Sequence, residues 1–212
     1  MRLQVAFDFL GLSDTLRVAE EIHELVDVVE VGTLLLWREG IETLREMKHR
    51  LPGAYLLVDS KIVDAGGDSA GFFFDAGADA VTVLGSATGT TIEATVAEGR
   101  RRGGYVVGDT IGWVDAVSTA RFLKDCGVDE ICVNASTDQV PSPSSYAELS
   151  TVREAVPGMR LSVSGRINTD VIPTIVQYHP ETLIVGRAVT QSVSPRKAVE
   201  ELRAAIEVAE GS

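Results

Sequence analysis

Three residues of the sequence, Asp59, Lys61 and Asp64, have types and spacing that could do chemistry together. A lysine between two carboxylates is held in its charged form, because nearby negative charge raises its pKa. Such a lysine is poorly suited to forming an imine, which requires a depressed pKa. It can instead donate hydrogen bonds to an oxyanion. The motif therefore indicates stabilisation of an enediolate, the anion formed when a carbon next to a carbonyl loses a proton or CO₂.

Other polar residues stand at or next to the ends of apolar, β-branched runs that predict strands. Besides Asp59 these are Asp8, Glu30, Asp109 and Asn134. An Asp in such a position can also simply cap the next helix. Glu30, however, stands in a run of valines, and a buried carboxylate needs a charged partner or a cation. Several carboxylates and one lysine at one opening predict a divalent cation, and oxygen ligands favour Mg²⁺.

Two glycine-containing segments late in the chain predict a phosphate site. They are Ser164-Gly165-Arg166 and Gly186-Arg187-Ala188, which follow the seventh and eighth predicted strands. Many barrels bind phosphate at this place through backbone N–H groups and a helix N-terminus. Arg187 could add a charge-assisted contact, whereas the charge of Arg166 could also face solvent. The alternative is that these glycines only make tight turns.

The elements that must position these residues alternate along the whole chain. Short β-branched runs predict eight strands: Leu3–Phe7, Val26–Val31, Ala54–Val58, Ala80–Leu84, Tyr105–Val107, Glu130–Val133, Arg160–Val163 and Thr182–Val185. Segments with apolar residues at helical spacing lie between them, including Asp14–Leu25, Gly40–Arg50, Thr90–Arg102, Val114–Cys126 and Pro195–Val208. Repeated βα units of this kind predict a parallel sheet in an α/β protein.

We expect one domain over residues 1–212, a (β/α)₈ TIM barrel, because 212 residues are near the lower limit for a complete barrel. An open doubly wound sheet is the structural alternative, but no glycine-rich dinucleotide loop follows an early strand. Three predicted helices are followed by a glycine that can adopt the positive φ of a helix C-cap, namely Gly77, Gly103 and Gly127. The loop rich in Pro and Ser over residues 140–145 is interpreted as a loop, not a domain boundary.

Composition narrows the class of partner. The formal net charge of −12 argues against binding nucleic acid or anionic lipid. No apolar run reaches the roughly 18 to 20 residues that span a bilayer. The two cysteines, Cys126 and Cys132, lack metal-ligand spacing, and no secretory leader precedes them, so we expect a reduced, cytoplasmic protein. Trp37 and Trp113 follow strands and are expected to pack against loops.

The segment Asp59-Ser60-Lys61-Ile62-Val63-Asp64 resembles the Asp-x-Lys-x-x-Asp motif of the orotidine 5'-monophosphate decarboxylase superfamily. Within it, three further segments resemble the branch that contains 3-hexulose-6-phosphate synthase and 3-keto-L-gulonate-6-phosphate decarboxylase: Val29-Glu30-Val31-Gly32-Thr33, Thr82-Val83-Leu84-Gly85 and Ile131-Cys132-Val133. The similarity runs over nearly the whole chain, and the glycines after Asp64 favour the synthase side.

The resemblance implies a homodimer with active sites at its interface, Asp64 reaching into the partner's site. It implies Mg²⁺ held by Glu30 and Asp59, and contact of Asp8 and Lys61 with a phosphorylated sugar. Gly165, Gly186 and Arg187 would hold the phosphate, with Arg166, Asp109 and Asn134 also facing the substrate. In the synthase, ribulose 5-phosphate loses a proton and the resulting enediolate adds to formaldehyde. In the decarboxylase, loss of CO₂ forms the enediolate instead.

Two positions depart from this pattern. Relatives begin the segment after the sixth strand with His, where this chain has Asn134, and Asn cannot act as a general acid or base. The change affects the synthase more than the decarboxylase, because only the synthase must remove a carbon-bound proton. Arg166 stands where relatives commonly carry Gly. A related reaction, a diverged barrel that binds a phosphosugar without turnover, and a barrel from outside the superfamily therefore remain as alternatives.

Overall fold

Eight parallel strands form a closed barrel in which neighbours in the chain are neighbours in the sheet, and β8 pairs with β1. The computed structural model describes residues 1–8, 11–112, 115–134 and 143–211. The strands are β1 (Arg2–Phe7), β2 (Val28–Val31), β3 (Leu56–Ile62), β4 (Ala80–Leu84), β5 (Tyr105–Asp109), β6 (Glu130–Asn134), β7 (Arg160–Ser164) and β8 (Thr182–Val185). The predicted (β/α)₈ barrel is confirmed.

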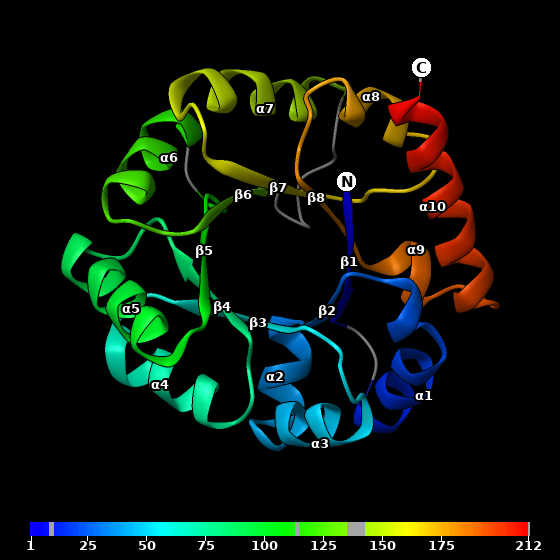
Figure 1. The fold of residues 1–212 in the computed structure, drawn as a ribbon, viewed down its shortest axis with the longest axis horizontal. Coiled ribbons are helices and arrows are strands. Elements are labelled where there is room, and N and C mark those ends of the chain that lie inside the picture. The colour runs from blue at the N-terminus through cyan, green and yellow to red at the C-terminus, as the bar shows by residue number, and fades with distance from the viewer. Residues whose placement is uncertain (9–10, 113–114, 135–142, 212) are drawn as a thin grey trace.

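Helices surround the barrel on its outside (Figure 1). They are α1 (Leu12–Ile22), η1 (His23–Leu25), α2 (Thr33–Glu39), α3 (Glu42–Arg50), α4 (Gly66–Asp75), α5 (Gly89–Arg102), α6 (Ala116–Asp125), α7 (Pro143–Ala155), α8 (Ile172–Val176), α9 (Arg187–Thr190) and α10 (Pro195–Glu210). The last helix, α10, packs against α1 and α8. Contacts between the first and last helices therefore help to close the ring.

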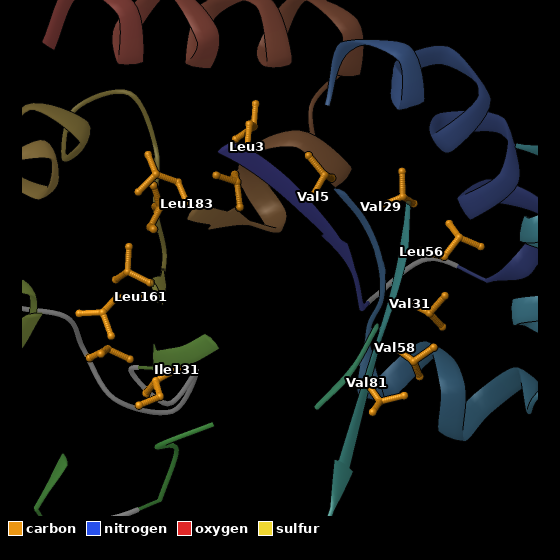
Figure 2. Packing of buried hydrophobic residues seen from close by; sticks show 14 of the residues in the cluster. Leu3, Val5, Val29, Val31, Leu56, Val58, Val81, Ile131, Leu161 and Leu183 are labelled. Atoms are coloured by element: carbon orange, nitrogen blue, oxygen red, sulfur yellow. The ribbon is translucent and has the colours of Figure 1, made fainter. Parts of the chain in front are cut away.

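The main hydrophobic core lies between the strands and the helices. In β1, Leu3, Val5 and Phe7 are fully buried, and their counterparts from the other strands line the same layer. Figure 2 shows the outward-facing residues of several strands, from Leu3 to Leu183, in this layer. Because side chains alternate along a strand, the residues between them must point into the barrel. That alternation directs Gln4 and Ala6 inward, where the candidate site lies.

Four carboxylates tie consecutive strands together in pairs, and we call them the latch carboxylates. Each accepts a hydrogen bond at 2.7 to 2.8 Å from a backbone N–H near the start of an odd-numbered strand: Asp27 from Leu3, Asp79 from Leu56, Asp129 from Val106 and Glu181 from Leu161. The N–H of each latch residue donates back to the carbonyl of the same partner. The barrel is therefore built from four similar units of two strands each.

The structure moves several predicted boundaries. β3 continues to Ile62, and β5, β6 and β7 end at Asp109, Asn134 and Ser164, so polar residues predicted to follow the strands are their last residues. They remain in strands because they keep their ladder pairing, as Asp109 does with Cys132. The start of β2 shifts from Val26 to Val28 because the chain before it forms η1.

Other predictions hold or lie outside the described residues. Gly77, Gly103 and Gly127 have the positive φ expected of them. Helix α2 is an addition to the predicted elements, and it begins two residues after β2 ends. Trp113, the segment 135–139 after the sixth strand and most of the loop at 140–145 fall outside the described residues. Among the described helices, none is both long enough and apolar enough to cross a membrane.

Candidate active site

A cavity of about 460 Å³ opens within the barrel and is lined by residues from all eight strands. Six of the predicted site residues line it: Asp8, Glu30, Asp59, Lys61, Asp109 and Asn134. They come from β2, β3, β5 and β6 and from the residue after β1. The parallel strands end at one edge of the barrel, so side chains distant in sequence meet there. The structure thus brings together the residues that the sequence indicated separately.

Lys61 sits at an irregularity in β3. The register between β3 and β4 shifts between Val58 and Ile62, and Lys61 has a positive φ of 46°. Few residues other than glycine adopt this conformation, and it costs free energy that surrounding contacts must offset. Thr82 on β4 provides them: its hydroxyl accepts the Lys61 N–H at 2.9 Å and donates to Asp59 Oδ1 at 3.0 Å. The irregularity turns Lys61 into the cavity beside Asp59.

Lys61 is held in its charged form by two carboxylates. Its Nζ donates to Asp59 Oδ2 at 2.6 Å and lies 3.8 Å from Asp109 Oδ2. Burial alone would lower the pKa of Lys61, but the charges of Asp59 and Asp109 outweigh it and raise this pKa above its ordinary value. A lysine in this state is a hydrogen-bond donor, not an imine-forming amine. The prediction from the sequence is consistent with this geometry.

Asp109 and Asn134 form a second polar pair on the wall made by β5 and β6. Asn134 Nδ2 donates to Asp109 Oδ2 at 3.0 Å, and the Ile111 N–H donates to Asp109 Oδ1 at 2.8 Å. Burial raises the pKa of Asp109 to about 6, despite the opposing charge of Lys61. A carboxyl group with this pKa can gain and lose a proton near neutral pH.

Glu30 is a buried carboxylate in the same cluster. Gln4 Nε2 donates to Glu30 Oε2 at 2.7 Å. Burial raises the pKa of Glu30 well above its ordinary value, and the negative charges of Asp59 and Asp8 add to the effect. Burial, followed by the charge of Asp59, likewise raises the pKa of Asp8. Gly32 is required here, since a Cβ on it would lie 2.4 Å from Asp8 Oδ1.

The donor set fits Mg²⁺. Glu30 and Asp59 supply carboxylate oxygens in a cluster whose mutual repulsion a divalent cation would relieve. Across residues 1–8, 11–112, 115–134 and 143–211, no three His, Cys, Asp or Glu side chains group as a metal site by themselves. Mg²⁺ does not need such a cage, because it commonly takes one or two carboxylates and completes its shell with water and substrate oxygens.

The predicted phosphate residues border the cavity and do not line it. Ser164 and Ile184 are cavity residues, and Gly165 and Gly186 follow close behind them in the chain. Gly165 and Arg166 both have positive φ, and the Gly165 carbonyl accepts a hydrogen bond from Tyr146. Arg187 begins α9 and is close enough to Asp8 to lower the pKa of that carboxyl.

Asp64 stands apart from the other motif residues. It is exposed beyond the end of β3, its carboxylate accepts the N–H of Ala65, and it is not among the residues that line the cavity of its own chain. The same spacing that brings Asp59 and Lys61 together therefore leaves Asp64 outside.

Several cavity residues were not identified from the sequence. Thr33 donates to Asp59 at 2.7 Å, Thr82 and Gln4 make the contacts given above, and Leu34 and Trp37 also line the cavity. Trp37 was expected to pack against loops, but it is about 75% exposed and borders the cavity, because α2 carries it there. A polar residue amid valines in a strand, as at Thr82, was a signal that could have been used.

Comparison with known proteins agrees with this site. Residues 1–202 match the orotidine 5'-phosphate decarboxylase / HUMPS family. A 3-hexulose-6-phosphate synthase of Bacillus subtilis is 32% identical over 204 residues, covering 96% of this chain and 97% of the relative. The crystal structure of the 3-hexulose-6-phosphate synthase from Salmonella typhimurium superposes with a TM-score of 0.92 at 30% identity, over 99% of this chain and 100% of that one.

The crystal structure of KGPDC from Streptococcus mutans, bound to a pentose 5-phosphate, has a TM-score of 0.91 at 26% identity, over 99% of each chain. The family match spans almost the entire chain, and the similarity to the synthases covers the barrel from end to end. The chain therefore belongs to the orotidine 5'-phosphate decarboxylase / HUMPS family and is a phosphosugar enzyme of that family.

Proposed function

We propose that the protein is a Mg²⁺-dependent carbon–carbon lyase that works through an enediolate, with the activity of a 3-hexulose-6-phosphate synthase. The observation that carries the proposal is Lys61, kept charged between Asp59 and Asp109 inside the cavity. A fixed cation beside the position where an oxyanion develops is the arrangement that lowers the barrier to enediolate formation. The names of the most similar relatives support the synthase.

The residues have separate roles in this proposal. Gly165, Arg166, Gly186 and Arg187 bind the phosphate, and Asp8 and Asn134 orient the sugar hydroxyls. Mg²⁺ bound by Glu30 and Asp59 would neutralise negative charge on the enediolate oxygens. Lys61 donates a hydrogen bond to the same anion. Because Asn134 cannot carry the proton, we assign that role to Asp109, whose pKa of about 6 suits it.

In the synthase direction, Asp109 as carboxylate takes a proton from the carbon of ribulose 5-phosphate next to its carbonyl. The enediolate then forms a carbon–carbon bond to formaldehyde, and the new alkoxide takes up a proton, so that none is gained or lost overall. Asn134 holds Asp109 in place through its 3.0 Å hydrogen bond. The burial of Asp109 keeps bulk water away from the proton it carries.

We further propose a homodimer in which Asp64 completes the partner's site. Two exposed apolar side chains, Leu34 and Trp37, line the cavity, and two more, Val63 and Phe72, lie in the segment that follows β3. Exposed apolar groups beside a site are characteristic of a surface that another molecule covers. Asp64 is exposed directly after Val63 in the chain. The free cysteines Cys126 and Cys132 fit the cytoplasmic location that we propose.

The decarboxylase activity is the second candidate, and Asn134 is the observation that favours it. Loss of CO₂ forms the enediolate without a base, so a decarboxylase would depend less on the proton carrier that Asn134 replaces. The two activities separate in one assay. Purified protein with Mg²⁺ receives ribulose 5-phosphate and formaldehyde in one reaction and 3-keto-L-gulonate 6-phosphate in another.

We expect hexulose phosphate to form in the first reaction, and CO₂ release in the second to be slower. Faster CO₂ release would assign the decarboxylase. Thermal stabilisation by both phosphosugars without any turnover would identify a binding protein instead and overturn the enzymatic proposal.

A further inference from the structure

The cavity continues below the catalytic residues into the interior of the barrel. Along β6, Asn134, Cys132 and Glu130 all line it. These residues alternate on one face of the strand, and four residues at about 3.3 Å each place Glu130 roughly 13 Å below Asn134. The cavity is thus a shaft that reaches well below Lys61 and Asp59.

The shaft contains polar groups where a barrel interior is usually filled by bulky branched side chains. Ser162 on β7 lines the cavity and is fully buried, and its hydroxyl has no hydrogen-bond partner among the described residues. Its register partner Thr182 on β8 is equally buried, and its hydroxyl is also unpaired within the described part of the chain. The Cys132 thiol lies beside Ser162 without satisfying that hydroxyl.

Buried hydroxyl groups without partners are costly, and native proteins usually satisfy them with ordered water. Water enters such a space when it is polar and roomy, whereas an apolar cavity stays dry. The shaft meets both conditions, since Ala6, Ser162 and Cys132 are small and carboxylates stand above and below them. Ordered water is therefore the ligand whose chemistry fits this part of the cavity.

A carboxylate stands at each end of the shaft. At the upper end, Asp109 is the register partner of Cys132. At the lower end, Glu130 is 3% exposed, and its carboxylate accepts a hydrogen bond from Tyr105 at 3.2 Å and lies 4.0 Å from Arg160 Nε. Burial raises the pKa of the Cys132 thiol, and the charges of Asp109 and Glu130 both contribute. The thiol therefore lies within electrostatic reach of both carboxylates.

We propose that ordered water fills the shaft between Asp109 and Glu130 and carries protons between these two carboxyl groups. The step is balanced: the proton on Asp109 passes to water while water gives one to Glu130, and no other reactant is needed. Glu130 is then a positioning and proton-storing residue that does not touch the substrate. The transport part rests on the proposed function, because Asp109 receives its proton from the sugar, whereas the water-filled shaft does not.

The water is tested by stability, without any substrate. Thr43 on α3 also carries a fully buried hydroxyl that is unpaired among the described residues, but it does not line the cavity. Replacing a dry unpaired hydroxyl by an apolar group should raise the melting temperature, by about 2 to 4 °C for each kcal/mol gained in a protein of this size. We expect this rise for Thr43→Val and no rise for Ser162→Ala, which loses a bond to water. An equal rise in both variants would show that the shaft is dry and overturn the proposal.

The proton path is tested by Glu130→Gln, with Glu207→Gln on the exposed face of α10 as the matched control. We expect kcat to fall about tenfold in Glu130→Gln with KM unchanged, less than the loss of a direct acid-base group. Glu130→Asp should recover part of the rate. Unchanged kcat in Glu130→Gln, or a fall shared with Glu207→Gln, would overturn the path. If the wild-type protein turns over no phosphosugar, the proposed function has failed, while the melting experiment still decides whether the shaft holds water.

Discussion

At the scale of single residues, the properties of the site depend on how few charges balance one another in a small buried volume. Lys61 is the one cation lining the described cavity, whereas Asp8, Glu30, Asp59, Asp109 and Glu130 line it as carboxyl groups. Removing the lysine therefore removes both the donor to the enediolate and the charge that balances its neighbours. The role of Lys61 can be separated from that of surface lysines.

We predict that Lys61→Met lowers kcat by about 10² to 10³, the usual loss when one oxyanion donor is removed. Steady-state kinetics with the phosphosugar measures the change. Lys197→Met, which removes an exposed lysine that pairs with Glu201, is the control and should keep the wild-type rate. Wild-type kcat in Lys61→Met would refute its role.

The raised pKa of Asp109 predicts a pH dependence. If ionised Asp109 is the base, kcat/KM rises with pH through about 6 and then levels off, and Asp109→Asn loses this limb together with about 10² to 10⁴ of the rate. The stability effect has the opposite sign. Because the folded pKa lies above the unfolded value, the contribution of Asp109 to stability is present below about pH 4 and is lost as the pH rises through about 6. A flat activity profile between about pH 5 and 8 would contradict the assignment.

At the scale of elements, the latch carboxylates explain why eight short strands hold one register. Each one accepts a backbone N–H near the start of an odd-numbered strand, and its own N–H donates to the carbonyl of that same residue. Asp79 and Asp129 follow the repeated phrases Ala-Gly-Ala and Cys-Gly-Val in the sequence. The hydrogen bonds that give this repeat its meaning appear only in the fold.

We predict that Asp129→Ala lowers the free energy of unfolding by about 1 to 3 kcal/mol, because it leaves the buried N–H of Val106 unpaired. Urea denaturation measures the loss. Asp125→Ala, at the exposed end of α6, is the matched control and should change stability little. Since Asp129 is far along the strand from the catalytic residues, kcat should stay close to that of the wild type.

Two latch carboxylates also predict the response to acid. Burial alone would raise the pKa values of Asp27 and Glu181, but hydrogen bonds from Leu3 and Arg203 to Asp27, and from Arg153 and Leu161 to Glu181, lower both. Their stabilisation is therefore present above the unfolded pKa of about 4 and is lost as the pH falls through the lower folded values. Asp27→Asn should weaken the fall in stability below about pH 4, and an unchanged acid limb would argue against this source.

The elements also show how far the sequence could be interpreted. The eight strands and their order were predictable, because β-branched runs alternate with helical periodicity along the whole chain. The ends of β3, β5 and β6 were not, since Asp59, Asp109 and Asn134 are polar yet belong to their strands. The turn of Lys61 into the cavity depends on a register shift held by Thr82, and local sequence gives no account of such a shift.

At the scale of the whole molecule, the proposed dimer is the part of the function that one chain cannot complete. The acidic and basic groups lining the cavity come from one barrel, but Asp64 is exposed outside it. The sequence motif predicted all three residues as one centre. One chain places only Asp59 and Lys61 in its own cavity, because β3 ends at Ile62 and the residues after it are exposed.

We predict that two inactive variants restore one another. Asp64→Asn and Lys61→Met each lose activity alone, but a mixed dimer contains one site with both native residues, so random exchange of subunits should restore about a quarter of the wild-type activity. Mixing after mild dissociation and assaying over time measures the recovery. A mixture that stays inactive, or a protein that sediments as a monomer, would contradict a shared site.

The central claim is that the cavity forms an enediolate from a phosphosugar, and one NMR measurement tests it most directly. Ribulose 5-phosphate is incubated with the protein and Mg²⁺ in D₂O without formaldehyde, and the signal of the hydrogens on the carbon next to its carbonyl is followed. We expect deuterium to replace that hydrogen with the wild-type protein, and neither Lys61→Met nor metal-free protein to support exchange. Absence of exchange by a folded, Mg²⁺-loaded protein that also shows no turnover would contradict the account.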